Sequence, residues 1–339
     1  MQSELWQQLI ETHPSDVFHT PQWLSVLEKT YGFSLRAKIL WKDEKIPVAG
    51  MPFIKIEDMF SPRIVSIPFS DFCDPIVKDS GQWDVLIESL LKEKLPISVR
   101  CLHTRIPLQD ERFEQVNRAN WHGLELNNDL DTIFKNFHSA SRRAIRKAER
   151  NGTTVRQAEN ETDLRAFFEM HLQIRKYKYK MVAQSYQFLL HIWRNFVETG
   201  QGVLLLAERE NKIIGGVFYL RWQNKLYYKF NASSLSAQDL RPNDLLMWEG
   251  IKYAKTNNCT FLDLGLSDWG QDGLVRYKQK YATNEKTIYF LKHIPNETID
   301  CSDKQMRGLL PKLTALFTDE SVPDEITEKA GDLLYRYFT

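Results

Sequence analysis

The chain has 339 residues, of which 42% are apolar, 12% aromatic and 26% charged, and its formal net charge is +1. At about 100 to 200 residues per domain, this length predicts two domains that each bury a core, and the composition excludes a disordered chain, a fibre and a mini-protein. The longest apolar run, 203–207, is much shorter than the roughly 20 residues of a membrane span, so we expect a cytoplasmic protein without a transmembrane segment.

The first part of the chain predicts a hairpin followed by strands and a helix. Apolar runs flank a charged turn within 39–55, a pattern typical of a β-hairpin, and the small-residue pair Ala49-Gly50 lies in its second strand. The remaining predicted elements of this part are a strand at 63–69, a helix at 83–94, a strand at 97–102, an amphipathic turn at 111–116 and a strand at 123–126.

The same order of elements returns when the sequence is shifted by 166 residues. Residues 205–221 then align with 39–55, and Gly215-Gly216 takes the place of Ala49-Gly50. Such an internal repeat predicts two similar modules. The other elements of the second copy are a strand at 225–231, a helix at 243–255, a strand at 260–266, an amphipathic turn at 273–280 and a strand at 287–292.

Helical patterns lie between and after the two copies. A stretch at 130–152 has an apolar stripe and a glycine at its end, a helix at 161–178 opens the second copy, and two helices follow Pro295. We therefore expect an α+β (mixed α/β) fold of two tandem modules, each a central mixed sheet flanked by helices. The predicted division is 1–130 for the first module, 131–295 for the second and 296–339 for a short C-terminal helical segment.

Charge is unevenly distributed along the chain. Residues 131–180 carry 12 Lys and Arg against 6 Asp and Glu, whereas 296–339 carry 5 against 9. The basic stretch is either a surface that faces phosphate groups of a nucleotide, a lipid pyrophosphate or RNA, or a solvated helix face. The pI of 7.7 argues against nucleic acid as the primary ligand, and we expect no DNA partner.

Several catalytic motifs are absent from the sequence. It contains no Gly-x-x-x-x-Gly-Lys-Ser/Thr, Gly-x-Gly-x-x-Gly, Gly-x-Ser-x-Gly or His-Glu-x-x-His pattern, which excludes the common ATPase, dinucleotide oxidoreductase, serine hydrolase and zinc peptidase classes. The four cysteines are far apart and lack zinc-finger spacing. We therefore expect no metal and interpret the cysteines as buried apolar residues.

The element order resembles that of the GNAT acetyltransferase module, and two such modules in tandem resemble the Fem family of aminoacyl transferases. The resemblance covers most of residues 18–295. It implies a transferase that forms an amide bond by moving an acyl or aminoacyl group onto a free amine, typically on a cell-wall or other glycan precursor. The segments that carry it are Arg142–Gly152, Gly215-Gly216, Tyr227–Ser233, Arg241–Glu249, Phe261–Gly265 and Leu274–Tyr281.

The predicted donor-binding loop departs from the acetyl-CoA pattern. Modules of this kind that use acetyl-CoA carry glycines before the helix that binds the pyrophosphate, because glycine lets backbone N–H groups close on the phosphates. Here the loop 236–244 has no glycine. We expect no tightly bound cofactor, and the donor is either an aminoacyl-tRNA, as the Fem resemblance implies, or an acyl-CoA.

Three residues are candidates for catalysis. Lys278, in the aromatic-lysine pair that the resemblance highlights, would stabilise the oxyanion, although it could be a surface lysine on an amphipathic helix. Tyr228 would position the amine or carry a proton, or it is a core residue. Asp263, inside an apolar strand, is either a base or the partner of a buried cation. On this basis Lys278→Ala should lower turnover with little loss of fold.

The candidate substrate-binding residues are cations, aromatic residues and polar side chains. Arg241 precedes a helix N-terminus, where its guanidinium and the helix dipole together would favour a phosphate, and the alternative is an ordinary exposed turn residue. The first module offers a polar cluster that is either an acceptor site or a plain turn. The full set is Arg241, Asn231, Tyr227, Tyr277, Arg143, Lys147, His171, Arg175, Ser70 and Asp71.

The sequence thus predicts a Fem-like N-acyl or aminoacyl transferase that acts on a nucleotide- or lipid-linked glycan or peptide, with charged tRNA as a partner and peripheral membrane contact left open. One alternative is an acyl-CoA-dependent N-acyltransferase for an amino sugar or small amine in polysaccharide synthesis. The other is a non-catalytic protein that binds RNA or a partner through its basic helix.

Overall fold

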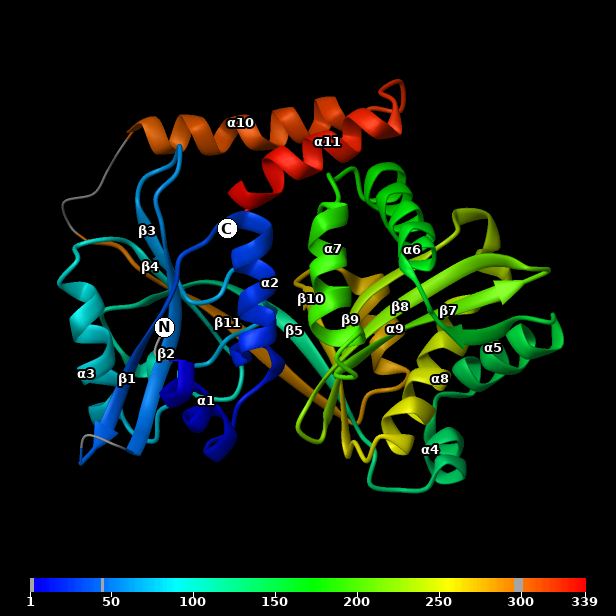
Figure 1. The fold of residues 1–339 in the computed structure, drawn as a ribbon, viewed down its shortest axis with the longest axis horizontal. Helices are drawn as coiled ribbons and strands as arrows, with labels where there is room; N and C mark the ends of the chain where they lie inside the picture. Colours follow the sequence, from blue (N-terminus) through cyan, green and yellow to red (C-terminus); the bar gives the residue numbers. More distant parts are fainter. Residues whose placement is uncertain (1–2, 44–45, 296–300) are drawn as a thin grey trace. The chain divides into compact units, whose positions relative to one another are not determined.

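The computed structural model describes residues 3–43, 46–295 and 301–339, which divide into two compact units. Unit 1 contains Met1–Asn120, Lys286–Pro311 and Thr339, and unit 2 contains Trp121–Glu285 and Lys312–Phe338. The expected mixed α/β class is confirmed (Figure 1). The module limits expected from the repeat, 1–130 and 131–295, stay a prediction, because compact units reflect packing and not duplication.

Unit 1 contains five strands with helices on both faces. Their order is β1-β2-β3-β4-β11, so a strand from late in the chain pairs with β4. Its elements are α1 (Ser3–Thr12), α2 (Pro21–Tyr31), β1 (Leu35–Lys42), β2 (Ile46–Ile56), β3 (Arg63–Val65), α3 (Ser80–Leu91), β4 (Ile97–Cys101) and β11 (Asn284–His293).

The two residues of the small-residue pair in β2 face opposite sides of the unit 1 sheet, and each faces a different helix. Ala49 lies in the apolar core with Trp83 and Leu86 of α3. Gly50 faces the other way, where a Cβ atom would lie only 2.6 Å from the Leu9 side chain of α1. The glycine therefore allows α1 to pack directly on the strand.

Unit 2 contains six strands in the order β5-β10-β9-β8-β7-β6. The division between the units falls within the strand β5 (Glu114–Glu125), after Asn120, and within the helix α10 (Cys301–Phe317), after Pro311. The other elements of unit 2 are α4 (Leu130–Asn136), α5 (Ser139–Arg150), β6 (Thr154–Gln157), α6 (Glu161–Gln173), α7 (Tyr186–Ile192), β7 (Gly202–Arg209), β8 (Lys212–Trp222), β9 (Lys225–Ser233), α8 (Pro242–Thr256), β10 (Phe261–Asp268), α9 (Asp272–Gln279) and α11 (Asp324–Leu334).

The glycine pair of β8 has the same function in unit 2 as Ala49-Gly50 in unit 1. A Cβ atom on Gly215 would lie 3.2 Å from Pro242 of α8, and one on Gly216 would lie 2.7 Å from the Phe167 ring of α6. Helices α5 and α8 cover one face of the sheet, and α6 and α7 cover the other (Figure 1). The repeat therefore marks equivalent points of helix contact in the two units.

The structure corrects three sequence predictions of local structure. The second half of the expected turn at 111–116 belongs to β5, which begins at Glu114 and runs on to Glu125. The expected helix at 130–152 is split, because Phe137 is extended and the His138 side chain caps α5 by accepting a hydrogen bond from the Ala140 N–H. The expected strand 63–69 ends at Val65, and Phe69 adopts a left-handed conformation.

The remaining elements agree in type with the sequence prediction. The expected helix 161–178 becomes α6 followed by a π-helical turn, Ile174–Lys178. The expected C-terminal segment begins at residues 296–300, which lie outside the described part of the chain, and continues as α10 and α11. Cys73, Cys101 and Cys259 are buried, whereas the side chain of Cys301 lies outside the described set.

Candidate active site

The parallel strands β9 and β10 separate soon after they begin to pair. Their register covers only three residue pairs, from Lys225 with Phe261 to Tyr227 with Asp263. Both strands then continue, to Ser233 and Asp268, without pairing to each other. Because backbone N–H and C=O groups in a protein interior need partners, this separation leaves groups that other residues or a ligand must satisfy.

A bulge in β9 lies next to this separation. In the pairing of β8 with β9, Tyr219 lies opposite Tyr228 and Phe218 lies opposite Phe230, so the register shifts by one residue at Lys229. Such an insertion bends a strand and increases its local twist. The bulge therefore helps to turn β9 away from β10 directly after Tyr228.

Asp263 fixes the backbone of β10 where pairing ends. Its carboxylate is 4% exposed, and Oδ1 accepts hydrogen bonds from the Trp121 indole at 2.9 Å and the Gly265 N–H at 2.7 Å. Gly265 adopts φ +73°, a conformation that favours glycine. These contacts are those of a residue that positions backbone, and the role of Asp263 as a base stays a prediction.

Lys278 of α9 reaches the same stretch of β10. The side chain is 3% exposed, and Nζ donates hydrogen bonds to the carbonyl oxygens of Gly265 at 3.0 Å and Leu266 at 2.7 Å. The alternative that Lys278 is a surface lysine is therefore wrong. A buried ammonium group at the point of strand separation is chemically suited to stabilise negative charge, because burial strengthens its electrostatic interactions.

A carboxylate that sequence analysis did not single out lies nearby, in the first turn of α8. Asp244 is 8% exposed, and its Oδ1 accepts a hydrogen bond of 2.6 Å from the Tyr281 hydroxyl. Burial raises the pKa of the Asp244 carboxyl, an effect that the Tyr281 hydrogen bond and the positive charges of Lys280 and Arg241 oppose. This group is held closer to its neutral form than an exposed aspartate.

Four tyrosines form a group beside Asp244, and we call them the tyrosine cluster: Tyr219, Tyr228, Tyr277 and Tyr281. Tyr219 and Tyr228 meet edge to face at 5.7 Å, as do Tyr277 and Tyr281 at 5.5 Å. Burial raises the pKa of all four hydroxyls, so they are neutral hydrogen-bonding groups at physiological pH. Two predicted site residues, Tyr228 and Tyr277, thus belong to one arrangement.

The other candidates on β9 and α9 mainly hold α8 in place. Asn231 donates a hydrogen bond to the side chain of Asn243 at 3.1 Å, and the Tyr277 hydroxyl donates to the Asn243 carbonyl at 3.0 Å. Tyr227 is buried, and its neighbours on the adjacent strands are Leu220 of β8 and Asp263 of β10. These contacts anchor the first turn of α8 to both β9 and α9.

Arg241 occupies the capping position before α8. It is exposed and adopts φ 60°, a left-handed conformation that costs a non-glycine residue about 1 kcal/mol or more. The first turn of α8 has no side-chain cap. Arg241 is therefore placed where its charge can act on Asp244 and on an anion at this helix end.

The basic helix α5 begins beside the tyrosine cluster. Phe137 contacts Tyr281 edge to face at 5.1 Å, and the His138 N–H donates to the Lys280 carbonyl. Arg143 and Lys147 are exposed on this helix, and its cations form no ion pair with any described residue. The positively charged residues of α5 are Arg142, Arg143, Arg146, Lys147 and Arg150.

His171 and Arg175 lie on the opposite face of the unit 2 sheet. His171 is buried beside Phe230 and shares a hydrogen bond with Gln184, and burial, helped by Arg175, lowers its pKa to about 4. Arg175 donates to the Val182 carbonyl. The structure does not bring these two residues to the tyrosine cluster, and the local contacts are those of packing residues.

In unit 1, Ser70 of the expected acceptor cluster forms hydrogen bonds within the protein. The Ser70 hydroxyl accepts a hydrogen bond from the Trp23 indole, and the Ser70 carbonyl accepts one from Arg100. Asp71 is half-buried beside it. Their role in binding an acceptor stays a prediction.

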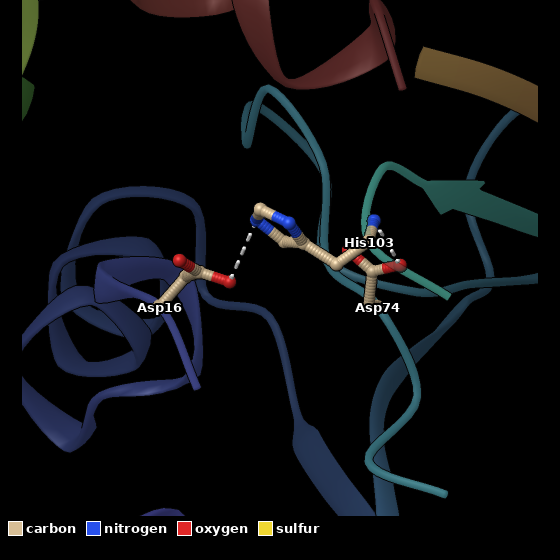
Figure 2. Close-up of side chains that lie close together, drawn as sticks. All are labelled: Asp16, Asp74 and His103. Carbon is tan, nitrogen blue, oxygen red and sulfur yellow. Dashed lines mark hydrogen bonds and ion pairs between the residues drawn. The ribbon is translucent and has the colours of Figure 1, made fainter. Parts of the chain in front are cut away.

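Unit 1 also contains a group of two aspartates and a histidine that sequence analysis missed. Figure 2 shows the His103 ring facing Asp16, with 3.6 Å between Nε2 and Oδ2, and Asp74 close by. Asp74 Oδ1 accepts three backbone N–H groups, from residues 102–104, so hydrogen bonds already account for its position. Burial, helped by the negative charge of Asp16, raises the pKa of Asp74 to about 7.

His122 is a buried imidazole that the sequence did not indicate. It is 1% exposed on β5, and neither ring nitrogen has a hydrogen-bond partner among the described residues. Burial and the positive charge of Lys278 lower its pKa, so the ring is neutral near pH 7. Because the prediction treated 111–116 as a turn, residue 122 had no assigned strand and no expected neighbour.

Comparison with known proteins shows a similarity over part of the chain. The model of the GNAT acetyltransferase domain matches residues 135–279, which include β7 to β10, α8 and α9. This match supports an acyl or aminoacyl transferase. Lys278, Tyr228, Asp263 and Asp244 all lie within the matched residues. No curated protein matches the sequence.

Solved structures show that the GNAT domain is part of a tandem fold. FemX is 15% identical with a TM-score of 0.69, covering 92% of this chain and 98% of its own. L-PGS from Bacillus licheniformis is 12% identical with a TM-score of 0.56, covering 92% and 96%. A tandem GNAT protein from the clavulanic acid biosynthesis pathway is 9% identical with a TM-score of 0.53, covering 87% and 94%. The chain therefore has the Fem-like tandem GNAT fold that the sequence predicted.

Among the described residues, no helix combines the length and apolar character needed to cross a bilayer.

Proposed function

We propose that the protein transfers an aminoacyl or acyl group onto an amino group of a nucleotide- or lipid-linked glycan or peptide precursor and so forms an amide bond. The observation that carries this proposal is the buried Lys278 ammonium group, held on two β10 carbonyls where β9 and β10 separate in the GNAT domain. Acyl transfer to an amine passes through a tetrahedral oxyanion, which a fixed cation in a water-poor site stabilises.

Two features support an aminoacyl-tRNA as the donor. The loop before α8 has no glycine, and Arg241 closes it in a left-handed conformation that does not build the usual glycine cradle for a pyrophosphate. The five cations of α5 begin beside the tyrosine cluster and suit a polyanion. The similarity in fold to FemX is in keeping with this donor. Either kind of donor is made in the cytoplasm, where we propose that the protein works.

An acyl-CoA donor is the second candidate. The GNAT domain match favours it, since the matched family is described as acetyltransferases. The acceptor would then be an amino sugar or a small amine in polysaccharide assembly.

The test compares donors and acceptors in one assay. Purified full-length protein is mixed with acetyl-CoA, a longer acyl-CoA or alanyl-tRNA, each with a UDP-linked muramyl peptide or glucosamine, and amide products are measured by mass spectrometry. We expect product from alanyl-tRNA and the muramyl peptide, and none after Lys278→Met. Product from a CoA ester alone would replace the tRNA donor, and product from no pair would overturn the proposed function.

A further inference from the structure

Asp244 is a mostly buried residue, and only one of its two carboxylate oxygens accepts a hydrogen bond from a described residue. Oδ1 accepts the 2.6 Å hydrogen bond from Tyr281, whereas Oδ2 accepts no hydrogen bond from the described residues and keeps contact with solvent. The residue as a whole is 8% exposed, so Oδ2 is the part of this carboxylate that a molecule from solution can reach. An accessible oxygen without a protein partner can accept a hydrogen bond from a ligand donor.

The position of Asp244 relates it to the separated strands. Asn243, next to it in the first turn of α8, is bound by Asn231 of β9 and by Tyr277 of α9. Tyr228 is the first β9 residue beyond the last pair with β10, it is half-buried, and its hydroxyl makes no hydrogen bond within the described chain. Asp244 thus lies between β9 and α9 at the point where the strands diverge.

The charged and titratable neighbours of Asp244 come from three parts of the chain. Tyr228 belongs to β9, Tyr277 belongs to α9 with Lys280 and Tyr281 directly after it, and Arg241 precedes α8. Burial raises the pKa of Asp244, and Tyr281, Lys280 and Arg241 limit the rise. A carboxylate with a pKa closer to neutrality is a better proton acceptor than an ordinary aspartate, provided that it can touch the reacting nitrogen.

We propose that Asp244 is the proton acceptor of the transfer reaction, with Tyr281 as the residue that positions it. This inference rests on the proposed function. As the amine nitrogen forms its bond to the acyl carbon, one N–H proton passes to the Asp244 carboxylate. The bond from the acyl carbon to the leaving oxygen or sulfur then breaks, and that atom takes the proton from Asp244. The carboxylate is regenerated, and the step needs no further reactant.

The test uses the full-length protein and whichever donor and acceptor pair of the panel above gives amide with the wild type. Asp244→Asn should lower kcat by about 100-fold or more, as loss of a general base does. Asp272→Asn, which changes an exposed aspartate in the first turn of α9, should leave the rate unchanged. Added formate should restore part of the activity of Asp244→Ala, because a small carboxylate can occupy the vacated position.

A second variant guards against loss of fold. Tyr281→Phe keeps the carboxylate but removes the hydrogen bond that lowers its pKa, so the acidic limb of the profile of kcat/KM against pH should move to higher pH. A folded Asp244→Asn variant with near wild-type turnover, or a Tyr281→Phe profile that does not move, would overturn the role of Asp244 alone. Absence of amide from every pair with the wild type would overturn the proposed function, and this inference with it.

Discussion

Asp263 and Lys278 bind the two ends of the same residue, Gly265. The carboxylate of Asp263 accepts the Gly265 N–H, and the ammonium group of Lys278 donates to the Gly265 carbonyl. The left-handed turn at Gly265 is thus held from both sides. An anion and a cation that are far apart in the sequence together fix the backbone of β10 beyond its last pair with β9.

Removal of the Asp263 carboxylate should destabilise unit 2. Asp263→Ala leaves the Trp121 indole and the Gly265 N–H without their acceptor, and we expect the free energy of unfolding to fall by about 3 kcal/mol. Urea denaturation followed by circular dichroism measures the change. Asp239→Ala, an exposed aspartate before α8, should change stability by no more than about 0.5 kcal/mol. Equal stability of the two variants would contradict the positioning role.

Lys278 should matter for both stability and turnover. Lys278→Met keeps most of the side-chain volume but removes the donors to the Gly265 and Leu266 carbonyls, so we expect a loss of about 1 to 3 kcal/mol in unfolding free energy. This differs from the sequence expectation of little loss of fold, because the side chain is buried. Arg276→Met, exposed on the same helix, is the matched control. A variant with wild-type amide formation would remove Lys278 from the mechanism.

Unit 1 should lose stability as pH rises, through Asp74. The folded pKa of about 7 lies above the ordinary aspartate value of about 3.9, so the stabilisation by the protonated form is complete below that value and is lost as pH rises through 7. Between pH 4 and pH 8, wild type should lose up to about 4 kcal/mol relative to Asp74→Asn. Asp43→Asn, on an exposed turn, should show no such trend. Parallel pH curves for wild type and Asp74→Asn would refute the assignment.

His171 should make the protein less stable as pH falls, which is opposite to the effect of Asp74. Its folded pKa of about 4 lies below the ordinary value of about 6.5, so its contribution to stability is present above pH 6.5 and is lost as pH falls through 4. Relative to His171→Gln, wild type should lose about 3 kcal/mol of unfolding free energy over that range. Chemical denaturation at a series of pH values tests this, with the half-buried His13→Gln as control. A midpoint near 6.5 would show that His171 is not buried in solution.

Much of the fold could be predicted because the repeat carries strong local signals. The hairpins around Ala49-Gly50 and Gly215-Gly216 are confirmed. Their apolar residues must face the buried sides of the sheet and their small residues must allow helices to approach, so both features are visible in the local sequence. The start of β5 was missed, since its first residues are polar and exposed and show no apolar alternation.

The site was only partly visible in the sequence. Lys278 and Tyr228 were found through a motif, but nothing local distinguishes a buried lysine that binds carbonyls from a surface one. Asp244 has the appearance of an ordinary acidic residue in a first helical turn, which the helix dipole favours anyway. The role that we propose for it depends on the hydrogen bond from Tyr281, 37 positions away, and such a contact is formed only by the tertiary fold.

The pairing of β11 with β4 affects how the chain folds as it is made. Tyr289 to His293 pair with Ile97 to Cys101, so the sheet of unit 1 receives this strand only after nearly all of unit 2 has been synthesised. Until then β4 has an open edge, which in other proteins is a template for aggregation. A nascent chain that stops at the boundary of the first repeat would be exposed to self-association or to chaperone capture, and completion of unit 1 must wait for residue 293.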